Sequence, residues 1–289
     1  MSIKNQIYEK KSISNYDENN LLIEKNSTTY SSEEITPGSL KEFFTRVVIQ
    51  KPTDLQIYWN NDQYEIKWRK DMEEIEETDA EINISHIPLK EMVANPKVSI
   101  RFLNSSSHMD VKAFIFERIK NRFTEEENRC FLFGNGEKEI HGILHNMYFD
   151  TIKKVSLEKS KNIIMALLEM EHKLPNVYKN DASWIMSRSF LLDLESYAYS
   201  KENNFNLLKD GLNYTLFGRK IFIFDDNSYN KDKNYASCIL IHKGAYVVME
   251  TNITMMENPY FSPPDVQLVY RKYVGGGVVV KEAIVFLTK

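Results

Sequence analysis

Two histidines and a cysteine are the residues whose chemistry could support metal binding or catalysis. His141 and His145 stand four positions apart, the spacing that places two metal ligands on one face of a helix. Gly142 lies between them, and no cysteine, aspartate or glutamate nearby offers an evident third ligand. We therefore expect no metal site. A small α+β enzyme that uses His141 or Cys130 stays as a minor alternative, although nothing in the sequence indicates its substrate.

Two glycine-rich segments resemble phosphate-binding loops only in composition. Gly134–Gly136 follows an expected helix and precedes none, which excludes a dinucleotide-binding loop. Gly275–Gly277 lies between two expected strands with no Lys-Ser/Thr pair after it, so we predict a bulged β-turn. The GxSxG, HExxH and kinase signatures are lacking, and the carboxylates cluster in solvated runs. The sequence thus predicts no catalytic residue and no cofactor.

Composition narrows the class of protein. The chain has 289 residues and a formal charge of −4, which argues against a dedicated nucleic-acid binder. Its two cysteines, Cys130 and Cys238, are predicted to be buried thiols of a reducing compartment. No apolar run approaches about 18 residues, so no membrane span is expected. The start of the chain lacks the apolar middle of a signal peptide. We expect a protein made in a cytosol.

A long amphipathic helix at residues 110–130 organises the elements around these residues. About 21 residues at about 1.5 Å each give a rod of roughly 30 Å. Ser107 or Asp110 is expected to cap its start, and Gly134 to supply the left-handed position that ends it. Its apolar side must meet a sheet or another helix. The apolar positions that recur near a 3.6-residue period are Val111, Phe114 or Ile115, Ile119, Phe123 and Cys130.

Before this helix the chain is mostly polar. Residues 1–39 have few aliphatic side chains and are predicted to be an arm, either a frayed terminus or one ordered only against a neighbouring subunit. Ser39–Gln50 is predicted as a short helix capped by Ser39, and Pro88–Asn95 as a second short helix before an extended piece.

Between these helices lies a long β segment with little apolar surface. Gln56–Trp59 and Tyr64–Trp68 are predicted as strands around a turn, followed by an acidic run and the alternating strand Ile82–Ile87. Because an isolated hairpin is marginally stable in water, we expect this segment to lean on another body. An exposed acidic loop of a monomer is the alternative.

After the long helix, helices and strands are mixed without a βαβ rhythm, which predicts the α+β class. A helix is expected within 150–172 and another at Ser187–Tyr199, on either side of the strand Ala182–Met186. The remaining expected strands are Lys220–Phe224, Ala236–His242, Ala245–Ile253, Val266–Tyr273 and Val278–Leu287.

The order of several features carries a family resemblance. An extended loop ends in an alternating strand, a short helix and the long helix follow, and F-L-x-G-x-G stands at Phe131–Gly136 before G-I-L at Gly142–Leu144. This order resembles the major capsid proteins of tailed phages with the Hong Kong 97-type fold, including prophage and gene transfer agent capsids. The family usually has proline before G-I-L, where this chain has His141. Ala182–Ser187 and the C-terminal strands are similar to later parts of that fold.

The resemblance implies an α+β capsid fold whose subunits assemble into hexamers and pentamers of an icosahedral shell around double-stranded DNA. DNA would be enclosed without sequence specificity. The implied segments are an N-terminal arm at 1–50, an extended β loop at 55–84, a peripheral domain at 85–150 with its spine helix at 110–130, an axial domain at 151–235, and peripheral return strands at 236–289.

The implied partners are further copies of the chain, a portal, and a separate scaffold or head protease, with no membrane. The implied location is the virion, assembled in the bacterial cytoplasm. An encapsulin-like nanocompartment shell with the same fold is the main alternative.

Some family members join a loop lysine to a neighbour's asparagine beside a glutamate base. Lys67 or Lys70 could supply the amine, but the asparagine region contains Pro263 and Pro264, and Arg271 and Lys272 stand near the glutamate position. Proline has no side-chain amide from which an amine could displace ammonia, so we predict no covalent lattice. The residues expected at inter-subunit contacts are Trp59, Tyr64, Lys67, Trp68, Arg271 and Lys272.

Overall fold

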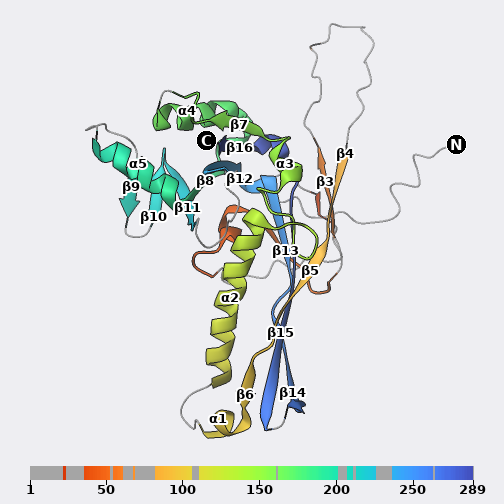
Figure 1. Ribbon diagram of the computed structural model, residues 1–289. Helices are drawn as coiled ribbons and strands as arrows, with labels where there is room; N and C mark the ends of the chain where they lie inside the picture. Colours follow the sequence, from red (N-terminus) through yellow and green to blue (C-terminus); the bar gives the residue numbers. More distant parts are fainter. Residues whose placement is uncertain are drawn as a thin grey trace, which may run out of the picture.

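The computed structural model describes residues 22–23, 36–52, 55–60, 68, 82–105, 111–160, 162–200, 207–210, 213–225, 236–262 and 264–288. Helices and strands are mixed along this part of the chain, which confirms the α+β class. The described strands form three sheets. The molecule is elongated: one sheet lies along a long helix, another lies across one end of that helix, and a narrow two-stranded ribbon stands beside them (Figure 1).

The long helix is confirmed as α2, Val111–Phe133. Ile119 and Phe123 are buried against Leu268 and Tyr270 of the adjacent sheet, which supplies the apolar partner the helix needs. Of the alternatives Phe114 and Ile115, Ile115 packs against this cluster and Phe114 is exposed. The expected caps Ser107 and Asp110 lie outside the described residues.

The end of α2 differs from expectation, because Gly134 does not adopt a left-handed conformation and Gly136 does, with φ of 77°. Gly134 is needed for space: a Cβ there would lie 2.1 Å from the carbonyl oxygen of Ile140. The chain then doubles back, and the amides of Ile143 and Leu144 donate to the last carbonyls of the helix, at 2.8 and 2.9 Å. Glycine is required because two backbone segments touch here.

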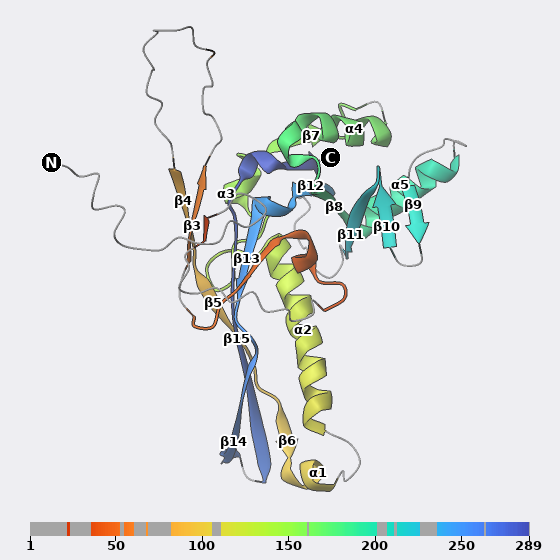
Figure 2. The same cartoon turned by 180° about the vertical axis from the view of Figure 1, so that it is seen from behind.

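The sheet beside α2 has six strands, and β15 is its centre. It pairs with β13 and β14 directly and also with β5 and β6 (Figures 1 and 2). The strands are β2 Thr45–Val48, β5 Leu89–Ala94, β6 Lys97–Ser99, β13 Tyr246–Glu250, β14 Thr254–Ser262 and β15 Asp265–Val278. Sequence reasoning did not identify β14.

The prediction of a turn at Gly275–Gly277 is wrong. All three glycines lie inside β15 and pair with Val247–Met249 of β13. A Cβ on Gly276 would lie 2.4 Å from the hydroxyl oxygen of Tyr246, whose ring is fully buried. That hydroxyl donates to the carbonyl of His141 at 2.8 Å. The glycines therefore continue the strand and leave room for a large aromatic ring behind it.

Two segments predicted as short helices contain a strand and no α-helix. Pro88–Asn95 contains β5, because its backbone pairs with Tyr270–Gly275 of β15. Ser39–Gln50 begins with the 3-10 turn η2 (Leu40–Phe43), which Ser39 caps as predicted, and continues as β2. Pairing across a sheet overrode a local helical pattern in both segments.

The second sheet has seven strands and crosses the end of α2. Together with helices α4 (Ile163–Lys173) and α5 (Arg188–Ser200) it forms what we call the seven-stranded sheet region. The helix expected within 150–172 begins only at Ile163, because Lys153–Ser156 forms β7 beside β16. In spatial order the strands are β7, β16 (Ile284–Thr288), β12 (Cys238–His242), β8 (Ala182–Ser187), β11 (Arg219–Phe224), β10 (Asn213–Leu216) and β9 (Leu207–Asp210).

Both β12 and β16 come from the segment expected to return to the peripheral domain. They lie between β7 and β8, so the boundary expected at residue 235 separates strands of one sheet. The domain boundaries stay a prediction. The remaining short elements are α1 Ile100–Ser105, α3 Asn146–Phe149, η3 Asn176–Tyr178, η4 Lys243–Ala245 and η5 Lys281–Ala283.

The third sheet is a ribbon formed by β3 (Leu55–Asn60) and β4 (Ile82–Ile87), with the short β1 (Leu22–Ile23) along β3. The alternating strand Ile82–Ile87 is confirmed, and its partner is β3. The strand predicted at Tyr64–Trp68 and the acidic run lie outside the described residues, apart from Trp68. Ile57 and Ile87 anchor the base of the ribbon in an apolar cluster. Farther along it, Ile84 is 61% exposed.

Candidate functional site

The residues singled out for metal chemistry do not form a site. The His141 and His145 rings lie 5.5 Å apart, and burial lowers the pKa of His141. Within the described part of the chain, the side chains close enough to share an ion are Glu126, Cys130 and Glu139, a set without either histidine. Arg129 donates to both of these carboxylates at 2.6 Å. A guanidinium already neutralises the carboxylates, which leaves them poorly suited to a second cation.

Cys130 is also a poor nucleophile. It is buried, and burial raises the pKa of its thiol to about 12, with the carboxylates of Glu126 and Glu139 adding to the effect. The thiolate is the reactive form, so this group stays protonated at neutral pH. Cys238 is fully buried and its pKa is raised in the same way. The prediction of two buried free thiols is confirmed.

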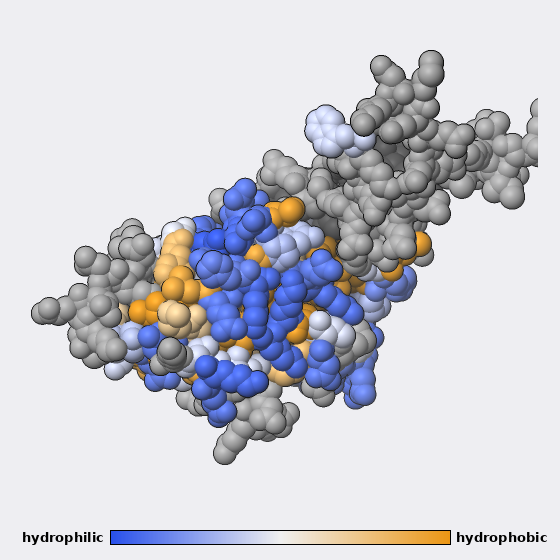
Figure 3. Space-filling model, turned by 90° about the horizontal axis from the view of Figure 1, so that it is seen from above, coloured by the Kyte–Doolittle hydropathy of each residue, from blue (hydrophilic) through white to orange (hydrophobic). Residues whose placement is uncertain are grey.

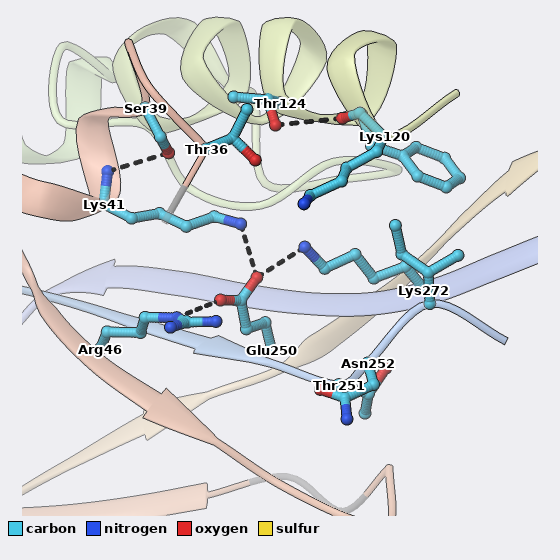
Figure 4. A pocket seen from close by; sticks show the side chains of 12 residues that line it. Thr36, Ser39, Lys41, Arg46, Lys120, Thr124, Glu250, Thr251, Asn252 and Lys272 are labelled. Atoms are coloured by element: carbon cyan, nitrogen blue, oxygen red, sulfur yellow. Dashed lines mark hydrogen bonds and ion pairs between the residues drawn. The ribbon is translucent and has the colours of Figure 1, made fainter. Parts of the chain in front are cut away.

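A buried group of charges joins the N-terminal segment to α2 and its sheet. We call Lys41, Arg46, Glu127, Glu250 and Lys272 the charge cluster, and Figure 4 shows all of these residues except Glu127. The Lys41 ammonium lies 2.5 Å from a carboxylate oxygen of Glu127 and 2.5 Å from one of Glu250. Lys272 lies 2.6 Å from each of the same two carboxylates. Arg46 donates to the other oxygen of Glu250.

Burial and ion pairing shift the pKa values of this cluster in opposite directions. The side chains of Lys41 and Lys272 are each 9% exposed, and burial lowers the pKa of Lys41. Burial would lower the pKa of Lys272 as well, but the carboxylates of Glu127 and Glu250 outweigh it and raise that pKa. Burial would raise the pKa of Glu250, yet its three cationic neighbours hold it well below its usual range. The ions are stable here only because they are paired.

The cluster fixes where the N-terminal segment enters the fold. Lys41 comes from η2 and Glu127 from α2. Glu250 is the last residue of β13, and Lys272 lies in the middle of β15. Asn128 strengthens the junction, because its side chain accepts from the Leu40 amide and donates to the Gly38 carbonyl, both at 2.8 Å. Losing one charge would leave its partners buried and uncompensated, which costs about 3–5 kcal/mol.

Sequence reasoning missed this cluster, although one signal could have found it. Glu127 stands four residues after Phe123 and four before Phe131, on the buried row of the helix. A carboxylate on the buried row of a helix must be paired with another group or else be exposed by the fold. Its partners could not be identified, because they come from segments far away in the chain.

Large apolar side chains are exposed at both ends of the molecule. At the end of α2 away from the seven-stranded sheet region, they form what we call the distal patch, on α1, the start of α2 and β14 (Figure 1). Its members are Ile100, Phe102, Phe114, Met255 and Met256. At the opposite end, Met165 on α4, Val177 and Leu192 on α5 are exposed. Figure 3 views this end, where hydrophobic residues show between hydrophilic ones. Grouped apolar exposure marks surfaces for protein contacts.

The six residues predicted at inter-subunit contacts lie apart from one another. Trp59 is in β3, where its backbone pairs with Asn83, and Trp68 is fully exposed. Arg271 lies 3.8 Å from Glu91 on the surface of the sheet, whereas Lys272 is buried in the charge cluster. Tyr64 and Lys67 lie outside the described residues. The inter-subunit role of all six stays a prediction.

Known proteins share this fold. A family model described as the Phage capsid family matches residues 45–289. The capsid of an empty GTA particle, computed with C5 symmetry, is similar with a TM-score of 0.71 and 20% sequence identity, over 90% of this chain and 94% of that chain. None of the curated proteins matches the sequence.

Two further structures show how widely the fold occurs. A chain of Gordonia phage Cozz is similar with a TM-score of 0.58 and 12% identity, over 91% of this chain and 90% of that one. The holo-SrpI encapsulin complex from Synechococcus elongatus PCC 7942 is similar with a TM-score of 0.64 and 10% identity, over 90% and 91%. Among the helices that the structure describes, none combines the length and apolar character that a membrane crossing needs.

Proposed function

Because the chain belongs to the phage capsid family and is a major capsid protein that forms a shell with the Hong Kong 97-type fold, we propose that its subunits close into hexamers and pentamers of an icosahedral shell around double-stranded DNA. Family and fold both point to a structural protein rather than an enzyme. Repeated head-to-tail contacts between identical subunits close into rings when the rotation between them is right.

The observation that carries this proposal is the ribbon of β3 and β4. Its base is buried with Val47, Val247 and Met249, but the ribbon stands clear of the seven-stranded sheet region and of α2 (Figures 1 and 2). With only the two-residue β1 added along β3, this ribbon buries too little apolar surface of its own to be stable in water. A neighbouring subunit would cover the ribbon, and residues 55–84 would then act as the extended loop of the shell.

The other exposed surfaces fit the same arrangement. We assign the seven-stranded sheet region to the centres of the rings, where Met165, Val177 and Leu192 would meet adjacent copies. The distal patch would meet subunits of neighbouring rings. Many modest contacts per subunit make a closed shell far more stable than any single interface.

The shell is proposed to be free of covalent cross-links. Lys272, near the position of the expected glutamate base, is an ammonium held by two carboxylates, and Arg271 is a guanidinium beside Glu91. Neither group accepts a proton at neutral pH. Denaturing electrophoresis of boiled particles should give one band near 34 kDa. A ladder of multimers would contradict this part of the proposal.

Expression of the full chain, alone and with a candidate scaffold protein from the same genome, tests the function directly. Negative-stain microscopy should show closed particles, and only compact monomers under both conditions would overturn the proposal. Nuclease-resistant DNA inside particles produced in the complete system would support a virion shell assembled in the bacterial cytoplasm, with a portal and a scaffold or head protease as partners. Packaged protein without DNA would favour a nanocompartment, the second candidate that the encapsulin similarity suggests.

A further inference from the structure

A small pocket opens beside the charge cluster, between α2 and the strands β13 and β15 (Figure 4). Its volume is about 50 Å³, several times the space that one water needs. Four cationic side chains line it, and the carboxylate of Glu250 is the one acidic group in its wall among the described residues. The cationic residues are Lys41, Arg46, Lys120 and Lys272.

The positive charges in this wall exceed the negative ones. Within the charge cluster, three cationic groups meet two carboxylates. Lys120 adds a fourth positive group, and no carboxylate of the described residues pairs with it. Figure 4 shows its ammonium directed into the same space as those of Lys41 and Lys272. Excess charge of one sign is costly where side chains are shielded from water.

Neutral donors complete the wall. The hydroxyl of Ser39, itself buried, accepts from the Lys41 amide at 3.3 Å and can still donate its own hydrogen. Thr36 and Thr251 add two more hydroxyl groups to the lining. Ammonium groups and hydroxyls are the donors that a carboxylate or phosphate oxygen accepts from.

We propose that this pocket binds one small free oxyanion, of the phosphate or carboxylate class, against Lys41, Lys120 and Lys272. The anion balances the charge that Glu127 and Glu250 leave uncompensated. Because the pocket is lined by the N-terminal segment, by α2 and by the sheet, a bound anion also strengthens the junction of these three parts.

Thermal unfolding of the full chain with increasing inorganic phosphate tests this proposal. Ionic strength is held constant with sodium chloride, because exposed charges are screened by salt. The unfolding temperature should rise steeply at first and then only with the logarithm of the phosphate concentration, as expected when a ligand binds only the folded state. A rise that stays linear, as general exclusion of phosphate from the surface produces, would overturn the proposal.

Lys120→Gln and Lys112→Gln form the matched pair of variants. Both remove one positive charge from α2, but Lys112 pairs with Glu257 on the surface, away from the pocket. Lys120→Gln should raise the phosphate dissociation constant fitted to this dependence about tenfold, the loss expected for one charge-assisted contact. Lys112→Gln should leave it unchanged, and Lys120→Arg should restore most of it. Equal phosphate responses in the two glutamine variants would overturn the proposal. None of these measurements depends on shell formation.

Discussion

In the seven-stranded sheet region, Leu167, Trp184 and Leu194 are buried among apolar side chains, whereas the junction of α2 with its sheet buries four charged residues. The first region is stabilised by area removed from water, which depends little on direction. The second depends on Lys41, Glu127, Glu250 and Lys272 meeting at ion-pair distances. An apolar core accepts small shifts between its layers, but this cluster is satisfied in one arrangement only.

The difference matches what each part must do. The junction receives the N-terminal segment and supports the base of the β3–β4 ribbon, so its geometry determines where these extensions leave the subunit. The seven-stranded sheet region needs only to hold α4 and α5 on their sheet. We infer that the charge cluster provides positional specificity, while the apolar clusters provide most of the stability.

Glu250→Gln should have the largest effect. It removes the carboxylate that pairs with Lys41, Arg46 and Lys272, and leaves these cations with Glu127 alone. The free energy of unfolding should fall by about 3–5 kcal/mol, measured by chemical denaturation. Glu257→Gln is the control, since that glutamate forms an exposed pair with Lys112, and it should lose about 1 kcal/mol or less. Similar losses in both would show that the cluster is not critical.

Leu167→Ala should cause the second-largest loss of stability. Leu167 is fully buried in the seven-stranded sheet region, so truncation should cost about 2–5 kcal/mol through lost burial and a cavity. The adjacent Leu168 is only partly buried, and its replacement by alanine should cost less. Denaturation of both variants in parallel checks the prediction. A negligible effect at Leu167 would mean that this region does not depend on apolar packing.

The loss of stability caused by Gly276→Ala should be smaller, but it should depend sharply on the position of the substitution. A Cβ at Gly276 would lie 2.4 Å from the Tyr246 hydroxyl oxygen, while one at Gly277 would meet nothing nearer than 3.7 Å. We expect Gly276→Ala to cost about 1–3 kcal/mol from overpacking, and Gly277→Ala to stay within about 0.5 kcal/mol of the parent. Unfolding temperatures of the two variants give the comparison, and a reversed order would refute the assigned strand register.

His242 should give the smallest effect, and it tests whether the seven-stranded sheet region responds to pH. Burial lowers the pKa of His242, and its Nδ1 accepts from the Gly244 amide at 3.1 Å. The unfolded chain therefore takes up a proton first, so this contribution is present above the usual value of 6.5 and is lost as pH falls below it. His242→Gln should flatten the pH dependence of unfolding between pH 7 and 5. An unchanged slope would contradict this assignment.

Local pattern predicted some elements well and others poorly, for identifiable reasons. The period of α2 and the alternation of Ile82–Ile87 are long and regular enough to be read directly. The spacing of Leu89, Met92 and Val93 fits a helix or a strand, and pairing with β15 decided between them. Gly275–Gly277 suggested a turn because the sequence does not show that Tyr246 lies behind them.

The surfaces that matter for assembly were harder to place than the fold. Trp68 is fully exposed, whereas Lys272 lies in a buried cluster that only the folded chain brings together. Its partners are Glu127 and Glu250, at sequence separations that no local pattern reveals. A charged residue on a strand looks the same in sequence whether it faces solvent or an ion pair.

The length and connections of β15 have a mechanical consequence. The strand begins beside the distal patch, pairs with four other strands along its length, and continues through η5 directly into β16 of the seven-stranded sheet region. Force applied at the distal end is carried along the strand as shear, and many hydrogen bonds must then yield together.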